Sequence, residues 1–391
     1  MSVTHPQGFS AAGTAGGLKS SGKKDVALVV NEGPQFVGVG VFTSNRVYAA
    51  PVAWSRQVVA DGRVDAVILN SGGANAATGP EGFADTHTTA EHVAEALQQT
   101  GRDISAGDVV VCSTGLIGTR LPMDKLLGGV DAAVAALAND GGADAAEAIM
   151  TTDTVAKTAV VEGGDWSIGG MAKGAGMLAP GMATMLCVIT TDAQIDAAQA
   201  RLALTEAVRV TLNRLDSDGC MSTNDTVVLL ANGASGASPE PSTFQAALTE
   251  LCHDLAQQLL RDAEGADHDI AITVQGASTE TAAEAVARAV ARSNLFKAAI
   301  FGRDPNWGRI IAAAGTVPED IAPFDATLID VWVNDVHVCK AAGVGEDRSL
   351  VDLTERDVNI VIDLHAGDAT ATVWTNDLTH DYVHENSAYS S

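Results

Sequence analysis

Short apolar runs alternate with longer amphipathic stretches along most of the chain. The runs are rich in Val and Ile, which is typical of buried strands, and they lie at Val26–Val30, Phe36–Phe42, Val64–Leu69, Asp108–Cys112, Met185–Thr190, Val227–Ala231, Ile270–Val274, Ala326–Val333, Val358–Leu364 and Thr370–Trp374. Ala-rich stretches with helical spacing predict helices at Thr89–Gln99, Asp131–Asn139, Ile195–Leu215, Phe244–Arg261 and Ala282–Ser293. Strands that alternate with helices predict a layered α/β protein. The segment Asn232–Pro241 (NGASGASPEP) predicts a surface loop.

Composition and charge narrow the classes of function. The 391 residues are 46% hydrophobic but only 4% aromatic, so Ala, Val, Leu and Ile must build the core. At roughly 100–200 residues per domain, this length predicts two or three structural units. The net charge of -26 repels phosphate backbones and anionic membranes, so we expect neither nucleic acid nor a membrane as partner. The N-terminus lacks the pattern of a signal peptide and no long apolar span is present, which predicts a cytoplasmic protein.

Cysteine and histidine positions argue against a metal centre. The five cysteines are scattered and form no CxxC pair, so neither a disulfide framework nor a zinc site is expected. The nine histidines show no metal-ligand spacing; His87 and His92 are better explained by an exposed helix face. We therefore expect no metal.

Two glycine clusters follow predicted strands. NSGGANAATG (Asn70–Gly79) and STGLIG (Ser113–Gly118) both begin where an apolar run ends. Glycine at such a position allows backbone N–H groups to point at a ligand, although each cluster is also compatible with a plain turn. Neither matches GxGxxG or GxxxxGK[ST], so a nucleotide site has little support.

The segment Gly169–Ala193 carries the most specific chemical signal. It reads as a glycine-rich loop with one lysine, Lys173, then a Pro-Gly turn, then Thr184 at the start of a buried strand. The Thr184 hydroxyl can attack the carbonyl of Ala183, and hydrolysis of the resulting ester would make Thr184 a new N-terminus. Its α-amine, with a pKa of about 7.7–8.0, would then serve as the base for its own hydroxyl. The alternative is an ordinary threonine at a strand start.

KGAGMLAPGMATML in this segment closely resembles the self-processing motif of the ornithine acetyltransferase/glutamate N-acetyltransferase (ArgJ) family of arginine biosynthesis. Further motifs similar to those of the family stand in chain order from residue 6 to residue 391: PQGFSAAG, NSGGANAATG, VVCSTGLIG, IMTTDT, STNDT, DAEGA, FGRDPNWGRI and ENSAYSS. The resemblance thus covers essentially the whole chain.

The resemblance assigns the groups that act on the acetyl carbonyl. It implies that Thr184 is the nucleophile, that the scissile bond is Ala183–Thr184, and that Thr114 and Gly115 are the oxyanion-hole pair. A glycine N–H beside a hydroxyl suits that role, and losing one such donor typically costs about 10²–10³ in rate. Lys173 matches the family's substrate-binding lysine, which can reach an α-carboxylate as a point charge.

The resemblance also implies substrate contacts at Thr151, Glu264, Asn386 and Ser391. On the residues alone, Thr151 can equally be a helix cap and Glu264 an exposed loop acid. Ser391 stands where threonine is common in the family, and Gly181 stands where asparagine is common, which bears on the geometry of self-cleavage. STNDT and DPNWGR receive only structural or rim roles.

The resulting expectation is a layered α/β sandwich of the self-processing ornithine acetyltransferase type, cleaved into an α chain (1–183) and a β chain (184–391). By resemblance these chains stay intertwined and associate as two α and two β. Acetyl passes from N2-acetyl-L-ornithine to L-glutamate by a ping-pong mechanism through an acetyl-Thr184 ester, without a cofactor, and acetyl-CoA is a candidate second donor. Two alternatives remain: an aminopeptidase or amidohydrolase with the same nucleophile, or a binding protein whose chain stays intact.

Overall fold

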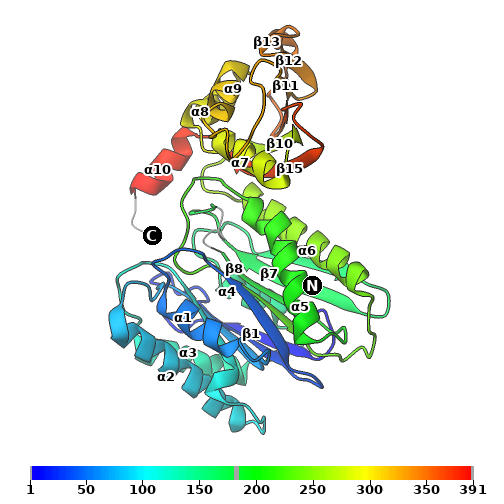
Figure 1. Ribbon diagram of the computed structural model, residues 1–391. Helices are drawn as coiled ribbons and strands as arrows, with labels where there is room; N and C mark the ends of the chain where they lie inside the picture. Colours follow the sequence, from blue (N-terminus) through cyan, green and yellow to red (C-terminus); the bar gives the residue numbers. More distant parts are fainter. Residues whose placement is uncertain (1, 180–184, 389–391) are drawn as a thin grey trace.

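The computed structural model describes residues 2–179 and 185–388 and contains two structural units (Figure 1). The larger unit holds two sheets and the smaller, C-terminal unit holds a third. Ala183, Thr184 and Ser391 lie outside the described residues, so their predicted roles are not placed by it.

The first sheet brings the two glycine clusters together. Its order is β1 (Phe9–Thr14), β2 (Val26–Asn31), β4 (Ala66–Ser71) and β5 (Val109–Thr114). Strands β4 and β5 are parallel, with Ser71 opposite Thr114, while the other neighbours are antiparallel. Because the carboxyl ends of parallel strands meet at one edge, the clusters after β4 and β5 are adjacent. The N–H groups of Gly72 and Gly73 both donate to the carbonyl of Thr114.

The second sheet joins the two halves of the sequence. Its order is β3 (Val37–Phe42), β9 (Thr226–Ala231), β8 (Leu186–Thr191), β7 (Ser167–Lys173) and β6 (Lys157–Glu162). β8 lies at the centre, antiparallel to β7 and parallel to β9, and β9 is antiparallel to β3. The Ala183–Thr184 bond falls between β7 and β8 in sequence. Two full strand pairings therefore hold 1–183 and 184–391 in one sheet, whether or not that bond is intact.

The two sheets pack face to face between helices. Their shared core contains Val29 and Leu69 from the first sheet and Val188 and Leu230 from the second. Helices α2 (Gly79–Gln98) and α3 (Met123–Ala135) cover the outer face of the first sheet, and α5 (Ala197–Val210) and α6 (Pro241–Arg261) cover that of the second. Helix α1 (Ala50–Val58) lies against β5, and α4 (Gly142–Ala148) against β1 and β2. The layers are thus helix, sheet, sheet, helix (Figure 1).

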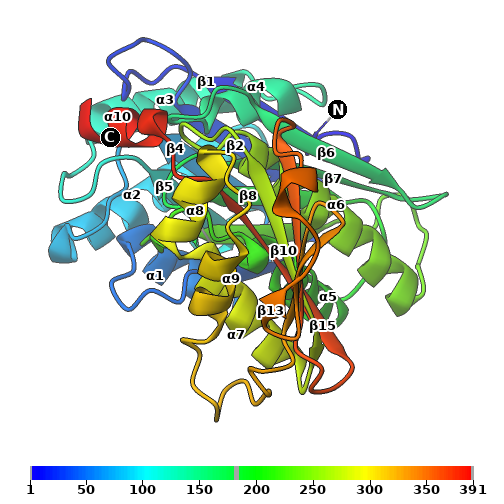
Figure 2. The same ribbon diagram turned by 90° about the horizontal axis from the view of Figure 1, so that it is seen from above.

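The C-terminal unit has its own core. Its sheet order is β13 (Gly343–Val344), β12 (Val336–Lys340), β11 (Asp330–Val333), β14 (Asp357–Asp363), β10 (Asp269–Ala277) and β15 (Ala369–Asn376). Helices α7 (Glu280–Ala291), α8 (Asn294–Phe301) and α9 (Trp307–Ala314) pack with this sheet. The last helix, α10 (His380–Ala388), leaves this unit and returns toward the larger one (Figures 1 and 2).

Each predicted strand and helix has a counterpart, and the predicted loop Asn232–Pro241 is confirmed up to residue 240, because Pro241 begins α6. Several boundaries and one element were wrong. The predicted glycine-rich loop around Lys173 is strand β7. Its glycines allow close packing: a Cβ at Gly169 would lie 2.2 Å from the carbonyl oxygen of Ser2, and one at Gly170 would lie 3.0 Å from Leu251. Helix α2 begins ten residues before the predicted Thr89, because Pro80 in its first turn starts the helix there. Within the described ranges no helix is long and apolar enough to cross a membrane.

Candidate functional site

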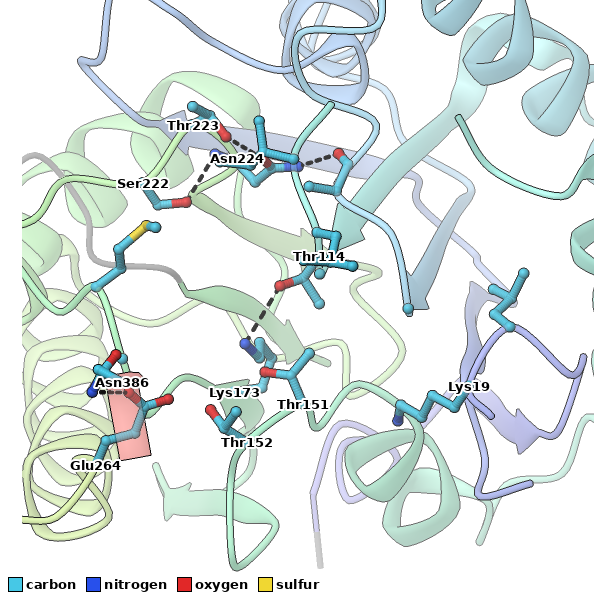
Figure 3. Close-up of a pocket in the computed structure, with 18 of the residues that line it drawn as sticks. Lys19, Thr114, Thr151, Thr152, Lys173, Ser222, Thr223, Asn224, Glu264 and Asn386 are labelled. Carbon is cyan, nitrogen blue, oxygen red and sulfur yellow. Dashed lines mark hydrogen bonds between the residues drawn. The ribbon is translucent and has the colours of Figure 1, made fainter. Parts of the chain in front are cut away.

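A cavity of about 560 Å³ lies where the ends of both sheets of the larger unit meet α10 (Figure 3). The first sheet contributes Thr114 and Gly115, the second contributes Lys173, and the C-terminal side contributes Glu264 and Asn386. The other described lining residues are Leu18, Lys19, Ser20, Ser21, Gly72, Ala74, Leu116, Ile117, Thr151, Thr152, Gly176, Met177, Ser222, Thr223 and Asn224. All predicted substrate and oxyanion residues that the structure describes therefore share one cavity.

Thr114 and Gly115 lie next to each other on the wall of this cavity. Thr114 ends β5 and is buried, and its hydroxyl accepts a hydrogen bond of 3.4 Å from Lys173 Nζ. Gly115 has φ +134°, and a Cβ there would lie 2.5 Å from the backbone nitrogen of Gly73. Only glycine fits this position, because of both the backbone conformation and the contact. Two donors thus lie side by side at the strand end, as an oxyanion site requires.

Lys173 is a buried cation at the end of β7. Its side chain is 1% exposed, and Nζ lies 3.9 Å from a carboxylate oxygen of Asp153. Burial lowers the pKa of Lys173 below its ordinary value of 10.5, while the charge of Asp153 acts in the opposite direction. The ammonium faces the cavity beside Thr114 (Figure 3). This placement suits the binding of a substrate carboxylate.

Asp153 connects the lysines to the loop that carries Thr151. One carboxylate oxygen accepts from Lys157 Nζ at 2.7 Å and from the N–H of Gly174 at 2.7 Å. The other accepts from the N–H of Thr151 at 2.9 Å. Burial by itself would raise the pKa of Asp153, but the charges of Lys173 and Lys157 outweigh it and hold the pKa below its ordinary value.

The network continues to the segment that carries Glu264. Lys157 is fully buried, and its ammonium also donates to Asp262 at 2.6 Å. Asp262 in turn accepts from the N–H of Thr154 at 3.0 Å. Two loops that are distant in sequence are thus fixed relative to each other on the same side of the cavity. Thr151 follows helix α4 and does not cap a helix, so that alternative is wrong.

Glu264 and Asn386 meet at one end of the cavity (Figure 3). Asn386 Nδ2 donates to a carboxylate oxygen of Glu264 at 3.1 Å and to the carbonyl of Tyr382 at 3.0 Å. The N–H of Glu264 donates to the carbonyl of Ala175 at 3.0 Å. Gly176 gives the carboxylate its room, since a Cβ there would lie 2.6 Å from a Glu264 oxygen. Helix α10 therefore contributes directly to the cavity.

Met185 and Leu186 are the first described residues after Thr184 in sequence. Met185 is buried, and its N–H donates to a carboxylate oxygen of Asp225 at 3.0 Å. Burial raises the pKa of Asp225 well above its ordinary value. Leu186, the first residue of β8, is the register partner of Lys173. The residue that follows Thr184 by two positions is thus paired with a cavity residue.

Sequence reasoning missed several residues of this site. The buried network of Asp153, Lys157 and Asp262 was not predicted. These residues lie inside or close to the motifs TTDT and DAEGA, but nothing in the two motifs indicates that their charged side chains are buried together. Asn224, in STNDT, lines the cavity, and its amide donates to the carbonyls of Ala74 and Ser113 at 2.6 and 2.8 Å. It holds the two glycine clusters together, which fits the structural role that was one of the two predicted for STNDT. Among the described residues no group of three or more His, Cys, Asp or Glu side chains is arranged to hold a metal ion.

The whole sequence is similar to known proteins. The model of the ArgJ family matches residues 10–391. Proteins named arginine biosynthesis bifunctional protein ArgJ are 61% identical in Streptomyces coelicolor and 60% identical in Thermobifida fusca, over 391 residues and 100% of each chain. A solved ornithine acetyltransferase from Mycobacterium tuberculosis, complexed with ornithine, is 61% identical, with a TM-score of 0.45 over 46% of this chain and 94% of that one.

Proposed function

The chain belongs to the ArgJ family, and from this premise we propose that it transfers acetyl groups between amino acids in arginine biosynthesis. The donor is N2-acetyl-L-ornithine and the acceptor is L-glutamate. Relatives that match the chain from end to end carry the name of bifunctional arginine biosynthesis proteins, which supports this assignment. The observation that carries it in the structure is one cavity that gathers Thr114, Gly115, Lys173 and Glu264 beside the start of β8.

Self-cleavage comes first. The Thr184 hydroxyl oxygen attacks the carbonyl carbon of Ala183, the peptide C–N bond breaks, and the acyl group moves from nitrogen to oxygen. Water then hydrolyses the ester, which leaves a carboxylate on Ala183 and a free α-amine and hydroxyl on Thr184. The products are chains 1–183 and 184–391. The pairing of β7 with β8 supports their remaining together.

Acetyl transfer uses the same hydroxyl. The α-amine of Thr184 takes the hydroxyl proton while the oxygen attacks the acetyl carbonyl of N2-acetylornithine. The C–N bond of the amide breaks, the proton passes to the leaving nitrogen, and ornithine departs from an acetyl-Thr184 ester. The α-amine of glutamate then attacks this ester, the C–O bond breaks, and the proton returns to the Thr184 oxygen. The two half-reactions make the kinetics ping-pong.

The cavity residues support these steps. The Thr114 hydroxyl and the Gly115 N–H stabilise the negative oxygen of each tetrahedral intermediate. Lys173 binds the α-carboxylate that donor and acceptor share. Glu264 receives an amino group of the substrate, held in place by Asn386. Thr151 and Ser391 complete the substrate contacts. No cofactor enters this scheme.

Three further assignments belong to the proposal. Acetyl-CoA serves as a second donor to glutamate, which would match the word bifunctional in the relatives' names. The assembly contains two α and two β chains. The enzyme works in the cytoplasm, with support from five cysteines that are all free in the structure.

Thr184→Ala tests the proposal directly. The wild-type protein should run as two chains on a denaturing gel, the second beginning at Thr184, whereas Thr184→Ala should remain one chain of 39.9 kDa without activity. Thr184→Ser, which keeps a hydroxyl, is the matched control and should still separate. An alanine variant that still separates into two chains would contradict the mechanism.

Kinetics separates the proposal from its alternatives. Double-reciprocal plots for acetylornithine and glutamate should be parallel, and acetylornithine alone should add one acetyl group to the chain that begins at Thr184. An aminopeptidase or amidohydrolase would pass the acyl group to water and form no acetylglutamate. A binding protein would stay intact and bind without turnover.

A further inference from the structure

The described walls of the cavity carry charges of both signs. Two cationic side chains line it, Lys19 and Lys173, and one carboxylate, that of Glu264. Lys19 approaches from the side opposite to Glu264 and Asn386, with Lys173 between them (Figure 3). In a chain with a net charge of -26 and only eight lysines, two lysines on one small cavity are a notable concentration of positive charge.

The two lysines differ in how their charge is balanced. Lys173 is buried and interacts with the carboxylate of Asp153. The ammonium of Lys19 donates to two backbone carbonyls, that of Lys24 at 2.7 Å and that of Ala148 at 3.5 Å, and among the described residues no carboxylate lies within ion-pair distance of it. An ammonium group has three donors, so Lys19 keeps donor capacity for a ligand and is not directly paired with a carboxylate of the described residues.

The backbone under Lys19 is held firmly by a buried carboxylate. Asp25 is 0% exposed, and one of its oxygens accepts from the N–H groups of Leu18 and Lys19 at 2.6 and 2.9 Å. Its other oxygen accepts from the N–H of Gly16 at 2.5 Å. Lys19 therefore projects from a fixed loop, whereas Lys23 in the same segment is exposed and does not line the cavity. Fixed placement of a charged group favours selective binding over general attraction.

The two substrates of the proposed reaction differ chiefly in the charge of the side chain. Glutamate and ornithine share an α-amino-acid head group, but glutamate ends in a carboxylate and ornithine in an ammonium group. One cavity that accepts both must offer a partner of each sign. We propose that Lys19 is the residue that selects glutamate, by binding its side-chain carboxylate. This inference rests on the proposed function and deepens it.

Electrostatics within the cavity agrees with this role. Burial lowers the pKa of Lys19, the charge of Asp25 raises it, and the charge of Lys173 lowers it again. Two ammonium groups thus repel each other across the cavity. A ligand with two carboxylates relieves this repulsion by neutralising both, while a ligand with one carboxylate relieves only part of it. The preference for glutamate over its neutral isostere glutamine follows.

The test compares glutamate with glutamine as acetyl acceptor in the mature enzyme. Lys19→Met removes the charge and keeps the length, and Lys23→Met is the matched control because it removes an equal charge nearby. The value of kcat/KM should be measured for each acceptor and for the donor acetylornithine. Lys19→Met should lower the glutamate-to-glutamine ratio of kcat/KM at least about tenfold, as expected when a hydrogen bond to a charged group is lost. The value for acetylornithine should stay within about twofold of wild type.

Lys23→Met should leave the ratio unchanged, and Lys19→Arg should retain most of it. An unchanged ratio in Lys19→Met, or an equal loss in Lys23→Met, would overturn the proposal. Equal losses for glutamate, glutamine and acetylornithine would also overturn it, since they would show a structural role for Lys19. Wild-type formation of acetylglutamate tests the proposed function separately, because only the change of ratio between variants depends on Lys19.

Discussion

The ammonium of Lys173 lies 3.4 Å from the hydroxyl oxygen of Thr114, and this contact joins the ends of two different sheets. Thr114 ends a strand of the first sheet and Lys173 ends a strand of the second. The contact places the proposed oxyanion donor and the proposed carboxylate-binding cation side by side. Chemistry on an acetylated amino acid needs both, since the acetyl carbonyl and the α-carboxylate belong to one small substrate.

The first prediction concerns the hydroxyl of Thr114. Thr114→Ala should lower kcat for acetyl transfer about 10²–10³-fold, because one of two oxyanion donors is lost. KM should change little, since the ground-state carbonyl carries less charge than the intermediate. Thr114→Ser is the control that retains the hydroxyl and should recover most of the rate. Equal losses in the serine and alanine variants would show that packing of the methyl group, rather than the hydroxyl, is what matters.

The second prediction concerns the buried carboxylate of Asp153. Asp153→Asn leaves Lys157 with one carboxylate fewer and should destabilise the protein by about 3 kcal/mol, a typical value for a broken buried pair. The apparent melting temperature at pH 7 should fall by several degrees. Asp140→Asn, at an exposed position, is the control and should leave it unchanged.

The difference between wild type and Asp153→Asn should depend on pH. The pKa of Asp153 in the folded protein is below its ordinary value of 3.8, so its stabilising effect is complete above that value. It is lost as the pH falls through 3.8 toward the folded pKa. The gap in melting temperature should therefore be constant near neutral pH and narrow below about pH 5. A gap that stays constant down to pH 3 would contradict the assignment of a lowered pKa.

The third prediction separates activity from stability at Gly176. A Cβ at this position would lie 2.6 Å from a carboxylate oxygen of Glu264, which sits at the end of a flexible side chain and can move away. Gly176→Ala should therefore displace the carboxylate and lower kcat/KM about tenfold, with little change in melting temperature. Gly128→Ala is the control: it lies in helix α3 with open space around it, so it should keep full activity and gain slight stability. If Gly176→Ala kept the wild-type kcat/KM, acetyl transfer would not depend on the position of the Glu264 carboxylate.

The strand pattern was readable from the sequence because buried strands here are nearly continuous runs of Val, Ile and Leu. Strand β7 was not readable, since Gly169, Gly170 and Lys173 are unfavourable in strands unless tertiary contacts require them. In β7 these contacts are the close packing of Ser2 against Gly169 and of Leu251 against Gly170, and both partners lie far away in sequence. Local pattern cannot show such contacts.

The site was predictable only in part for a similar reason. Its motifs are local, so Thr114, Gly115, Lys173 and Glu264 could be singled out one by one from the family resemblance. The ion-pair network is not local, because Asp262 is 105 residues away from Lys157 in sequence. Neither segment contains a pattern that predicts an ion pair with the other. Asn224 received only a general structural or rim role for the same reason, because its bonds to the carbonyls of Ala74 and Ser113 reach two distant segments of the first sheet's edge.

The last prediction concerns the C-terminal helix. Terminal residues usually tolerate change unless contacts fix them, and α10 has such contacts: Asn386 donates to the carboxylate of Glu264 at 3.1 Å. Deletion of residues 386–391 should leave the protein folded and self-cleaved, because cleavage uses Thr184 and the oxyanion donors. It should lower kcat/KM for acetyl transfer at least about tenfold, or roughly 1.4 kcal/mol of transition-state binding. Asn386→Ala should reproduce much of the loss, whereas Ser387→Ala, which removes only an exposed hydroxyl bonded to the carbonyl of His384, should not. A truncated enzyme with wild-type kcat/KM would show that the helix packs beside the cavity without serving it, and Glu264 would then need no partner from the tail.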